Sequence, residues 1–243
     1  MKRTILNNKF DLGKAAAKQG ANLIKQAISK NGKANIIIAT GASQFEMLKA
    51  LVQEDIDWSV VTCFHLDEYI DLPETHPASF RKYLKERFAN IVKPFAFHYV
   101  NGENNVKNEC LRLHNLIILH PIDVAFVGIG ENAHLAFNDP PADFDIKDSY
   151  LEVVLDFDCR IQQLGEGWFK NLEEVPKKAI SMSINRIMQS QHIICSVPDK
   201  RKGNAIDKVV NGQVTPKVPA SILQKHKSTY LFLDKKSSFL LNQ

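Results

Sequence analysis

The sequence predicts a single α/β domain built on a mostly parallel sheet. Two kinds of hydrophobic periodicity alternate along the chain: short β-branched runs typical of buried strands, and stretches of about 10–15 residues with helical spacing. This alternation is typical of βαβ units, in which helices connect parallel strands. No repeat, low-complexity tract or Gly/Ser-rich linker divides the chain, so we expect one domain over residues 1–243.

The first half of the chain contains the strongest elements. Residues 11–30 place apolar side chains on one helical face, and Asn31-Gly32 supplies a stop signal. The β-branched run 35–39 is typical of a strand buried on both faces. The remaining elements expected in this half are a helix with its apolar face at Phe45, Leu48, Leu51 and Val52, a strand at 60–64, helices at 78–90 and 104–119, and a strand at 123–129.

The second half is expected to contain weaker strands at 150–155, 193–197 and 229–233, with a helix at about 200–211. In parallel α/β sheets, ligands bind beyond the carboxyl ends of the strands. The residues that directly follow each strand are therefore the candidates for a functional site.

Composition and charge exclude several classes of protein. Lys and Arg total 31 against 27 Asp and Glu, a net charge of +4 that is too small and dispersed for nucleic-acid binding but suits an anionic small molecule. No run of 18 apolar residues suggests a membrane span, and no secretory signal is expected. The four cysteines form no CxxC pair, so we expect neither a metal site nor a disulfide framework. A reduced, soluble, cytoplasmic protein is expected.

The loop after the 35–39 strand has the features of an anion site. Ser43 and Glu46 have the spacing of a capping box, and Gly41 allows a tight strand-to-helix turn with outward backbone N–H groups. Such a turn suits phosphate, although the loop is neither a Walker loop nor a GxGxxG fingerprint. An ordinary capped helix is the alternative.

The loop after the 60–64 strand carries two adjacent acids, Asp67 and Glu68. A carboxylate held there in a partly dry pocket is a candidate general base. A solvated acidic turn is the alternative.

The loop after the 123–129 strand contains two glycines followed by His134 among apolar neighbours, with Asn132 and Asp139 close in sequence. A histidine with an orienting side chain can transfer protons at neutral pH. A hydrogen-bonded core histidine is the alternative. Taken together, the three loops indicate proton transfer on a small phosphorylated molecule.

Six motifs follow one another along the chain: ATGAS (39–43), FHLDEYIDLP (64–73), HPASF (76–80), GIGENAHLAFNDP (128–140), VPKKAISMS (175–183) and PASILQKH (219–226). In this order they resemble the glucosamine-6-phosphate deaminase/isomerase family, within a superfamily that includes 6-phosphogluconolactonases. The resemblance spans about residues 35–233, and it implies a Rossmann-like α/β fold with helices on both faces of the sheet and no cofactor. It also implies an enzyme that isomerises an amino-sugar phosphate from aldose to ketose and releases ammonia hydrolytically, giving fructose 6-phosphate.

The resemblance also implies catalytic roles. Asp67 matches the carboxylate that moves a proton from C2 to C1 of the open-chain sugar, and His134 matches the imidazole that opens the ring. Asn132 and Asp139 stand where the family has two acids that orient this histidine. We expect Asn132 to accept the ring N–H hydrogen bond in place of the acid, or else to cap the turn after Gly130.

The phosphate site is implied in the same way. Thr40, Gly41, Ala42 and Ser43 match the phosphate turn, and Lys202 matches a phosphate-binding lysine. The family's phosphate-binding arginine has no match at its usual spacing, and Arg160 is the nearest candidate. The segment 165–169 is expected to form a lid or a sugar contact, or else a surface turn anchored by Trp168 in the core. Segment 165–169 reads Gly165-Glu-Gly-Trp-Phe169.

Two other functions stay open at this point. A lactonase of the same superfamily is disfavoured because lactonases usually read DER where this chain has Asp67-Glu68-Tyr69, and because they lack the AFN-acid-P stretch found at 136–140. A non-catalytic sugar-phosphate-binding protein is suggested by the loss of one orienting acid. Whether the chain forms a homo-oligomer is also open.

Overall fold

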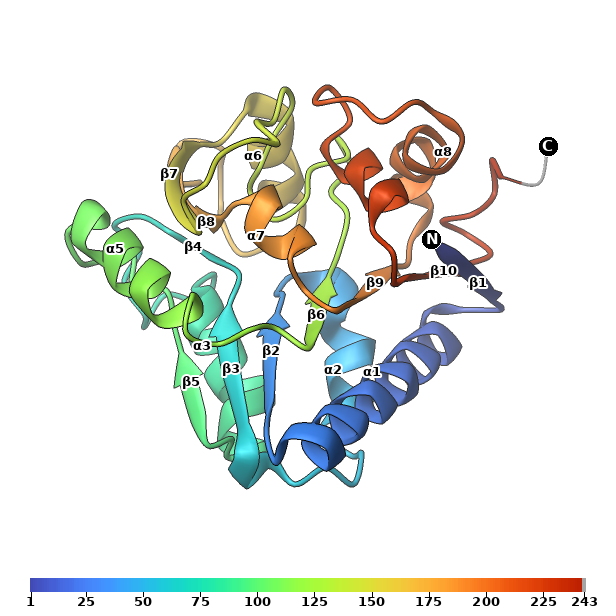
Figure 1. Cartoon of the computed structure of the whole chain (residues 1–243). Coiled ribbons are helices and arrows are strands. Elements are labelled where there is room, and N and C mark those ends of the chain that lie inside the picture. Colours follow the sequence, from blue (N-terminus) through green and yellow to red (C-terminus); the bar gives the residue numbers. More distant parts are fainter. Residues whose placement is uncertain (242–243) are drawn as a thin grey trace.

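The computed structural model describes residues 1–241 and confirms the α/β fold, with a seven-stranded sheet in the order β1-β10-β9-β6-β2-β3-β5 (Figure 1). All six neighbouring pairs in this sheet are parallel. The strands are β1 (Lys2–Leu6), β2 (Ala34–Ile38), β3 (Val61–His65), β5 (Ala96–His98), β6 (Val124–Val127), β9 (His192–Val197) and β10 (Thr229–Asp234).

Helices cover both faces of this sheet, as the resemblance implied. Alternate side chains of each central strand enter opposite cores: Ile36 and Ile38 pack on one face, and Ile37 packs on the other. The first core is covered by α1 (Lys9–Asn31), α2 (Phe45–Leu51) and α3 (Phe80–Leu84), which continues through a π-helical turn (Lys85–Ala89) into α4 (Asn90–Val92). The second core is covered by α5 (Val106–Ile117), α7 (Ile184–Met188) and α8 (Gly203–Asn211).

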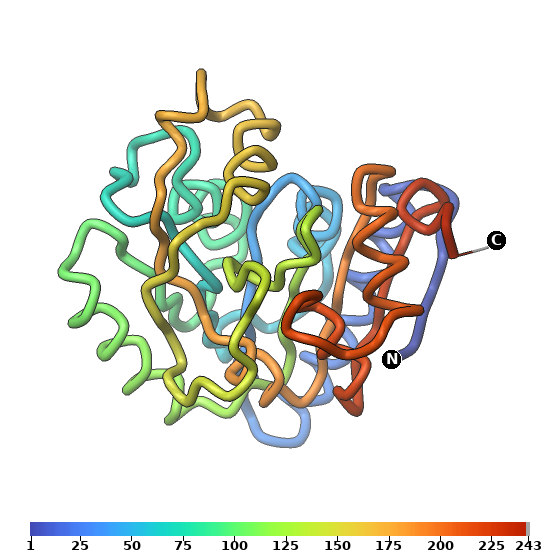
Figure 2. The backbone as a smooth tube through the Cα atoms, turned by 90° about the horizontal axis from the view of Figure 1, so that it is seen from above, coloured from blue at the N-terminus to red at the C-terminus, as the bar shows by residue number. Residues whose placement is uncertain are grey.

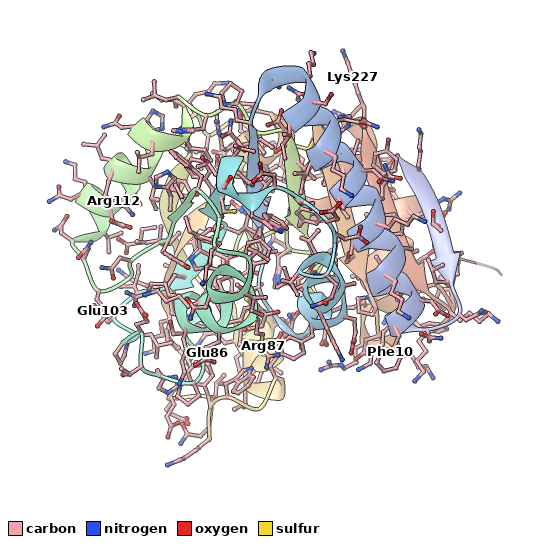
Figure 3. The ribbon with its side chains drawn as sticks, turned by 90° about the horizontal axis from the view of Figure 1, so that it is seen from below. Phe10, Glu86, Arg87, Glu103, Arg112 and Lys227 are labelled. Carbon is pink, nitrogen blue, oxygen red and sulfur yellow. The ribbon has the colours of Figure 1, made fainter. Side chains whose placement is uncertain are left out.

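The longest helix, α1, has clear start and stop signals in the sequence. The Asn8 side chain accepts hydrogen bonds from the backbone N–H groups of Phe10 and Asp11, which satisfies two free donors of the first turn. At the other end Gly32 adopts φ 72°, the left-handed conformation that ends helices and that glycine adopts without strain. Seen from below, α1 lies along the sheet with Phe10 at its N-terminal end (Figure 3).

A second, three-stranded antiparallel sheet lies over the carboxyl ends of the large sheet (Figures 1 and 2). Its order is β4 (Asp67–Tyr69), β8 (Lys178–Met182) and β7 (Tyr150–Val154). The strand expected at 150–155 therefore forms, but in this sheet. Its burial alternates along the strand, as expected for an antiparallel sheet with one solvated face. The helix α6 (Phe157–Gly165) follows β7, and together they form a layer above the strand ends.

The lengths and hydropathy of the helices bear on the expectation that the chain has no membrane span. Within residues 1–241, none of the helices is both long enough and apolar enough to cross a bilayer. All four cysteines are free in the structure.

Candidate active site

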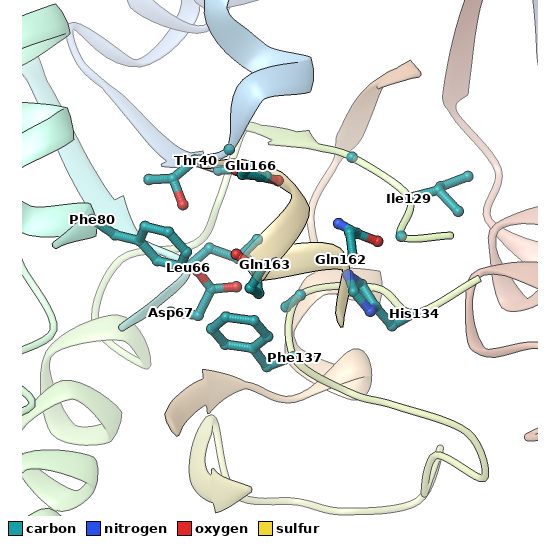
Figure 4. Close-up of a pocket in the computed structure, with 15 residues that line it drawn as sticks. Thr40, Leu66, Asp67, Phe80, Ile129, His134, Phe137, Gln162, Gln163 and Glu166 are labelled. Atoms are coloured by element: carbon teal, nitrogen blue, oxygen red, sulfur yellow. The ribbon is translucent and has the colours of Figure 1, made fainter. Parts of the chain in front are cut away.

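A pocket lies at the carboxyl ends of the parallel strands (Figure 4). The structure brings all three predicted loops to it. Thr40 and Gly41 follow β2, Asp67 follows β3, and His134 follows β6. The helix α6 closes the pocket from above with Gln162, Gln163 and Glu166.

Asp67 is buried at the edge of the pocket, with 5% of its surface exposed. Burial raises the pKa of this carboxyl to about 8, and the neighbouring Glu68 adds to the increase. The alternative of a solvated acidic turn is therefore wrong. A carboxyl whose pKa lies near neutrality can both take and return a proton, as a general base must in an isomerisation.

Glu68 has a different task from its neighbour, because it holds the following loop in place. Its carboxylate accepts hydrogen bonds from the Ser79 hydroxyl and from the backbone N–H groups of Phe80 and Arg81. The Arg81 guanidinium lies 3.4 Å from the same carboxylate. The segment 76–80 is thus wrapped around a buried acid, and this packs Phe80 against the pocket.

His134 is oriented by Asp139. The Nδ1 atom of the ring lies 3.0 Å from Oδ1 of this carboxylate. Burial alone would raise the pKa of Asp139, but the hydrogen bond and charge of His134, together with the Asn132 amide, hold it below its usual value. A lowered pKa keeps the carboxylate charged beside the ring.

The expectation that Asn132 accepts the ring N–H hydrogen bond is wrong. Its side-chain oxygen accepts the backbone N–H of His134 at 3.0 Å, which is a local turn two residues long. Its Nδ2 donates to Asp139 and to Asp156, at 3.0 and 3.1 Å. Asn132 therefore caps the turn, as the alternative proposed, and also bridges two carboxylates.

Gly130 explains why the loop after β6 needs a glycine. A Cβ atom at this position would lie 2.3 Å from the imidazole of His134. The ring therefore packs directly on the glycine backbone, and a side chain would displace it.

One group of possible metal ligands borders the pocket: donor atoms of His134, Asp139 and Cys159 lie within 4.8 Å of one another. The Cys159 thiol is fully buried, and burial raises its pKa far above the usual value, with Asp139 adding to the effect. Metals bind the thiolate, and a raised pKa disfavours it. The oxygens of Asp139 also already accept hydrogen bonds from His134, Asn132 and the Asp156 backbone. The arrangement favours a hydrogen-bonding network over metal coordination.

The capping box expected at Ser43 and Glu46 does not form. The chain enters α2 through a short 3-10 turn (Ala42–Gln44), so Ser43 stands inside this turn and the helix begins without a side-chain cap. Glu46 instead lies 3.7 Å from the Lys9 ammonium. The Gln44 amide donates to the Ser43 hydroxyl and to the carbonyl of Ser196 on β9, which holds the turn against the sheet.

Lys202 lies in the same groove as this turn, which it reaches from β9, two strands away from β2 in the sheet. It ends a 3-10 turn (Lys200–Lys202) after β9, and only 6% of its surface is exposed. Burial lowers the pKa of its ammonium to about 8, and Glu131 and Glu166 partly oppose this change. Lys202, Ala42 and Ser43 line one groove, which adjoins the pocket at Gln162 and Glu166.

Arg160 does not line the pocket or this groove, which corrects its assignment as a phosphate ligand. It lies on the face of α6 that is turned toward residues 170–175, where its guanidinium donates to the carbonyls of Leu172 and Val175. Four further cations line the groove with Lys202, and the sequence did not indicate them as site residues: Lys9, Lys200, Arg201 and Lys236. For Lys200 and Arg201, the signal in the sequence is their place directly before Lys202.

Two further pocket residues, Gln162 and Gln163, were also missed, because no element was expected where α6 lies. Glu166 belongs to segment 165–169, which was expected to form a lid or a sugar contact, and it does line the pocket. The alternative that Trp168 anchors segment 165–169 in the core is wrong. Trp168 is 40% exposed, and the buried anchor is Phe169.

A parallel α/β sheet with a buried acid and an oriented histidine in a pocket at its carboxyl edge defines a Rossmann-like α/β protein with its candidate site at the strand ends. The chain belongs to the family described as glucosamine-6-phosphate isomerases/6-phosphogluconolactonase, whose model matches residues 7–232.

Relatives of known name match over nearly the whole chain. A glucosamine-6-phosphate deaminase from Oenococcus oeni is 34% identical over 245 residues, covering 100% of both chains. One from Clostridium botulinum is 37% identical over 234 residues, covering 93% of this chain and 92% of its own.

Solved structures agree on the fold. A monomeric glucosamine-6-phosphate deaminase superposes with a TM-score of 0.88 at 27% identity, covering 99% of this chain and 100% of its own. A 6-phosphogluconolactonase from Thermotoga maritima superposes with a TM-score of 0.80 at 15% identity, covering 96% and 99%, and this likeness concerns the fold alone.

Proposed function

We propose that this protein deaminates an amino-sugar phosphate: glucosamine 6-phosphate to fructose 6-phosphate and ammonia, or a close epimer to its corresponding ketose phosphate and ammonia. The observation that carries the proposal is the pairing, in one pocket, of a buried acid of raised pKa with a histidine held by a carboxylate. The names of the full-length relatives support the same substrate.

In this proposal His134 acts first. With Nδ1 held by Asp139, its Nε2 is free to move a proton between the C1 hydroxyl and the ring oxygen, which opens the sugar to its aldehyde form. Asp139 stabilises the charged ring that forms during this transfer.

Asp67 then acts on the open chain. Its carboxylate takes the proton from C2 while one proton of the substrate ammonium passes to the C1 oxygen, which leaves a neutral enolamine. Asp67 then returns its proton to C1, which gives the protonated imine at C2. Water adds to this imine and ammonia leaves, so one water is consumed and the reaction is hydrolytic in its overall balance. The raised pKa of Asp67 favours the return of the proton.

The turn Thr40–Ser43 and Lys202 would hold the phosphate. Backbone N–H groups and a buried ammonium are suited to a dianion, and both line the groove that adjoins the pocket. Binding there places the reacting carbons toward Asp67 and His134. The same proposal places the protein in a reduced intracellular compartment, with a small sugar phosphate as its binding partner.

A substrate panel tests this function. Ammonia, ketose phosphate and acid are measured with glucosamine 6-phosphate, its galacto and manno epimers, unphosphorylated glucosamine and 6-phosphogluconolactone. We expect ammonia and ketose in equal amounts from one amino-sugar phosphate and no acid from the lactone. Acid release without ammonia would identify a lactonase instead, and binding without turnover would identify a non-catalytic receptor.

A further inference from the structure

Glu166, at the end of α6, lies on the turn that is built to bind an anion. A Cβ atom on Gly41 would lie 3.8 Å from its Oε1, and the neighbouring Ala42 backbone N–H acts to lower the pKa of its carboxyl. Figure 4 shows Glu166 beside Thr40 at the edge of the pocket. A carboxylate of the chain itself therefore occupies part of the anion turn.

The same side chain stands between two cavities. It lines the pocket that contains Asp67 and His134, and it also lines the groove that contains Ser43 and Lys202. Gln162 and Glu166 are the residues that line both cavities, so a phosphosugar with its reacting carbons at Asp67 and its phosphate at Lys202 would extend past Glu166.

Two cationic residues of the groove, Lys202 and Arg201, favour the charged form of Glu166. Burial raises the pKa of its carboxyl, while Lys202, the Ala42 N–H and Arg201 oppose that change. Lys202 is in turn buried and faces Glu166 and Glu131. The carboxylate thus offers the buried lysine the negative charge that a phosphate would bring.

The segment around Glu166 is short, partly exposed and placed between two buried anchors. Gln163 is buried and its side chain accepts a hydrogen bond from the Tyr69 hydroxyl, and Phe169 is buried on the other side. Between them, Gly167 adopts φ 84° with no atom within 4 Å of a Cβ position, and Trp168 is 40% exposed. The backbone N–H groups of Glu166 and Gly167 donate to the carbonyls of Gln163 and Leu164, so an outward movement of residues 165–168 has to break these two hydrogen bonds.

We propose that Glu166 is a built-in occupant of the anion site, which a phosphate group displaces as residues 165–168 swing outward. The inference rests on the phosphate subsite of the proposed function. The Glu166 carboxylate then weakens phosphate binding, because the phosphate must displace a contact that already exists.

Calorimetric titration with inorganic phosphate tests the competition. We expect Glu166→Gln to bind phosphate about 5- to 150-fold more tightly than the wild type, the range of an ordinary coupling between two ligands of one site. Glu131→Gln is the matched control, since it removes the same charge from a residue that also faces Lys202. Equal tightening in both variants would show a general charge effect and overturn the proposal, and so would unchanged affinity in Glu166→Gln.

Trp168 reports the movement separately. The chain has two tryptophans, and Trp58 is buried at 8% exposure, so Trp58→Phe leaves Trp168 as the only reporter. We expect a saturable change in its fluorescence with the same midpoint as the calorimetric titration. Phosphate that binds without changing this fluorescence would contradict displacement of the segment.

Failure of this inference is distinguishable from failure of the proposed function. If no amino-sugar phosphate is deaminated but Glu166→Gln still tightens phosphate binding, the proposed function is wrong, but the inference that Glu166 occupies the anion site holds. If the wild type is a deaminase and Glu166→Gln leaves phosphate affinity unchanged, only the inference about Glu166 is wrong.

Discussion

The Nδ1 atom of His134 lies 3.0 Å from Oδ1 of Asp139, and the same oxygen accepts a hydrogen bond from Asn132 at 3.0 Å. The chain returns to place Asp139 beside the ring through a tight loop, in which Leu135 bridges to Asn138. Asp139 therefore reaches the His134 ring, and the Asn132 amide fixes Asp139 in place rather than the ring itself.

From this relationship we expect Asn132→Asp to destabilise the protein. The new carboxylate would face Asp139 and Asp156, which now accept hydrogen bonds from the Asn132 amide. The substitution removes two hydrogen-bond donors and places like charges in contact. We expect these two effects to lower the free energy of unfolding by about 2–4 kcal/mol at pH 8. Urea denaturation at pH 8 measures this change.

Asn132→Ala is the control for this substitution, because it removes the same donors without adding a charge. Asn132→Asp should be less stable than Asn132→Ala at pH 8, and the difference should shrink toward pH 4 as the carboxyls take up protons. A variant with aspartate as stable as the wild type at pH 8 would show that the amide does not bridge the two acids.

The central sheet could be predicted because its strands are buried on both faces and therefore read as β-branched or apolar runs. Ile36, Ile37 and Ile38 are all fully buried, and each is visible in the sequence. The edge strand β1 was missed because almost all of it is exposed and it has no such run. The edge strand β5 was missed because only three residues form it.

The site residues that directly follow strands could be predicted from the sequence. Thr40, Asp67 and His134 come directly after β2, β3 and β6, and topology alone brings these positions to one edge. Glu166 could not be found in this way, because it reaches the pocket from α6, far along the chain in a layer that only tertiary packing places there. The capping box failed for a local reason: a 3-10 turn shifted the start of α2 past Ser43.

For Lys202 we expect substitution to affect binding more than chemistry. Lys202→Ala should raise KM for the phosphorylated substrate by about tenfold or more with a smaller change in kcat, since the phosphate is held equally in the ground and transition states. Lys208→Ala, on the exposed side of α8, is the control and should leave both constants unchanged. Steady-state kinetics over a range of substrate concentrations separates the two constants. An unchanged KM in Lys202→Ala would place the phosphate elsewhere.

The buried Asp67 should reduce stability at neutral pH. Its pKa is about 8 in the folded protein against 3.8 in the unfolded chain, so the folded state holds the extra proton between these values and stability falls as pH rises through that window. Asp67→Asn removes this cost. We expect the variant to be more stable than the wild type by about 1–4 kcal/mol at pH 7, and the gain to vanish near pH 4. Thermal unfolding at both pH values measures it, and a gain that is independent of pH would contradict the linkage.

The same carboxyl should set the acidic limb of the reaction. Only deprotonated Asp67 can take the proton from C2, and with a pKa of about 8 it is mostly protonated at pH 7. The value of kcat/KM should therefore rise about tenfold between pH 7 and pH 9, after the separately measured titration of the substrate amine has been accounted for. A profile that is flat over this range would mean that Asp67 is already ionised in the free enzyme.

Asp67→Asn should then reduce turnover by at least about 10²-fold at every pH, the smallest contribution usual for a positioned general base, while sugar-phosphate binding stays close to that of the wild type. Asp71→Asn is the matched control: it is the same substitution four residues later in the same loop, at an exposed position outside the pocket lining. We expect this control to keep wild-type turnover and the wild-type pH profile. If Asp67→Asn retained more than about a tenth of wild-type turnover, another group would have to carry the proton from C2 to C1, since a base that supplies 10²-fold or more cannot be removed at so small a loss.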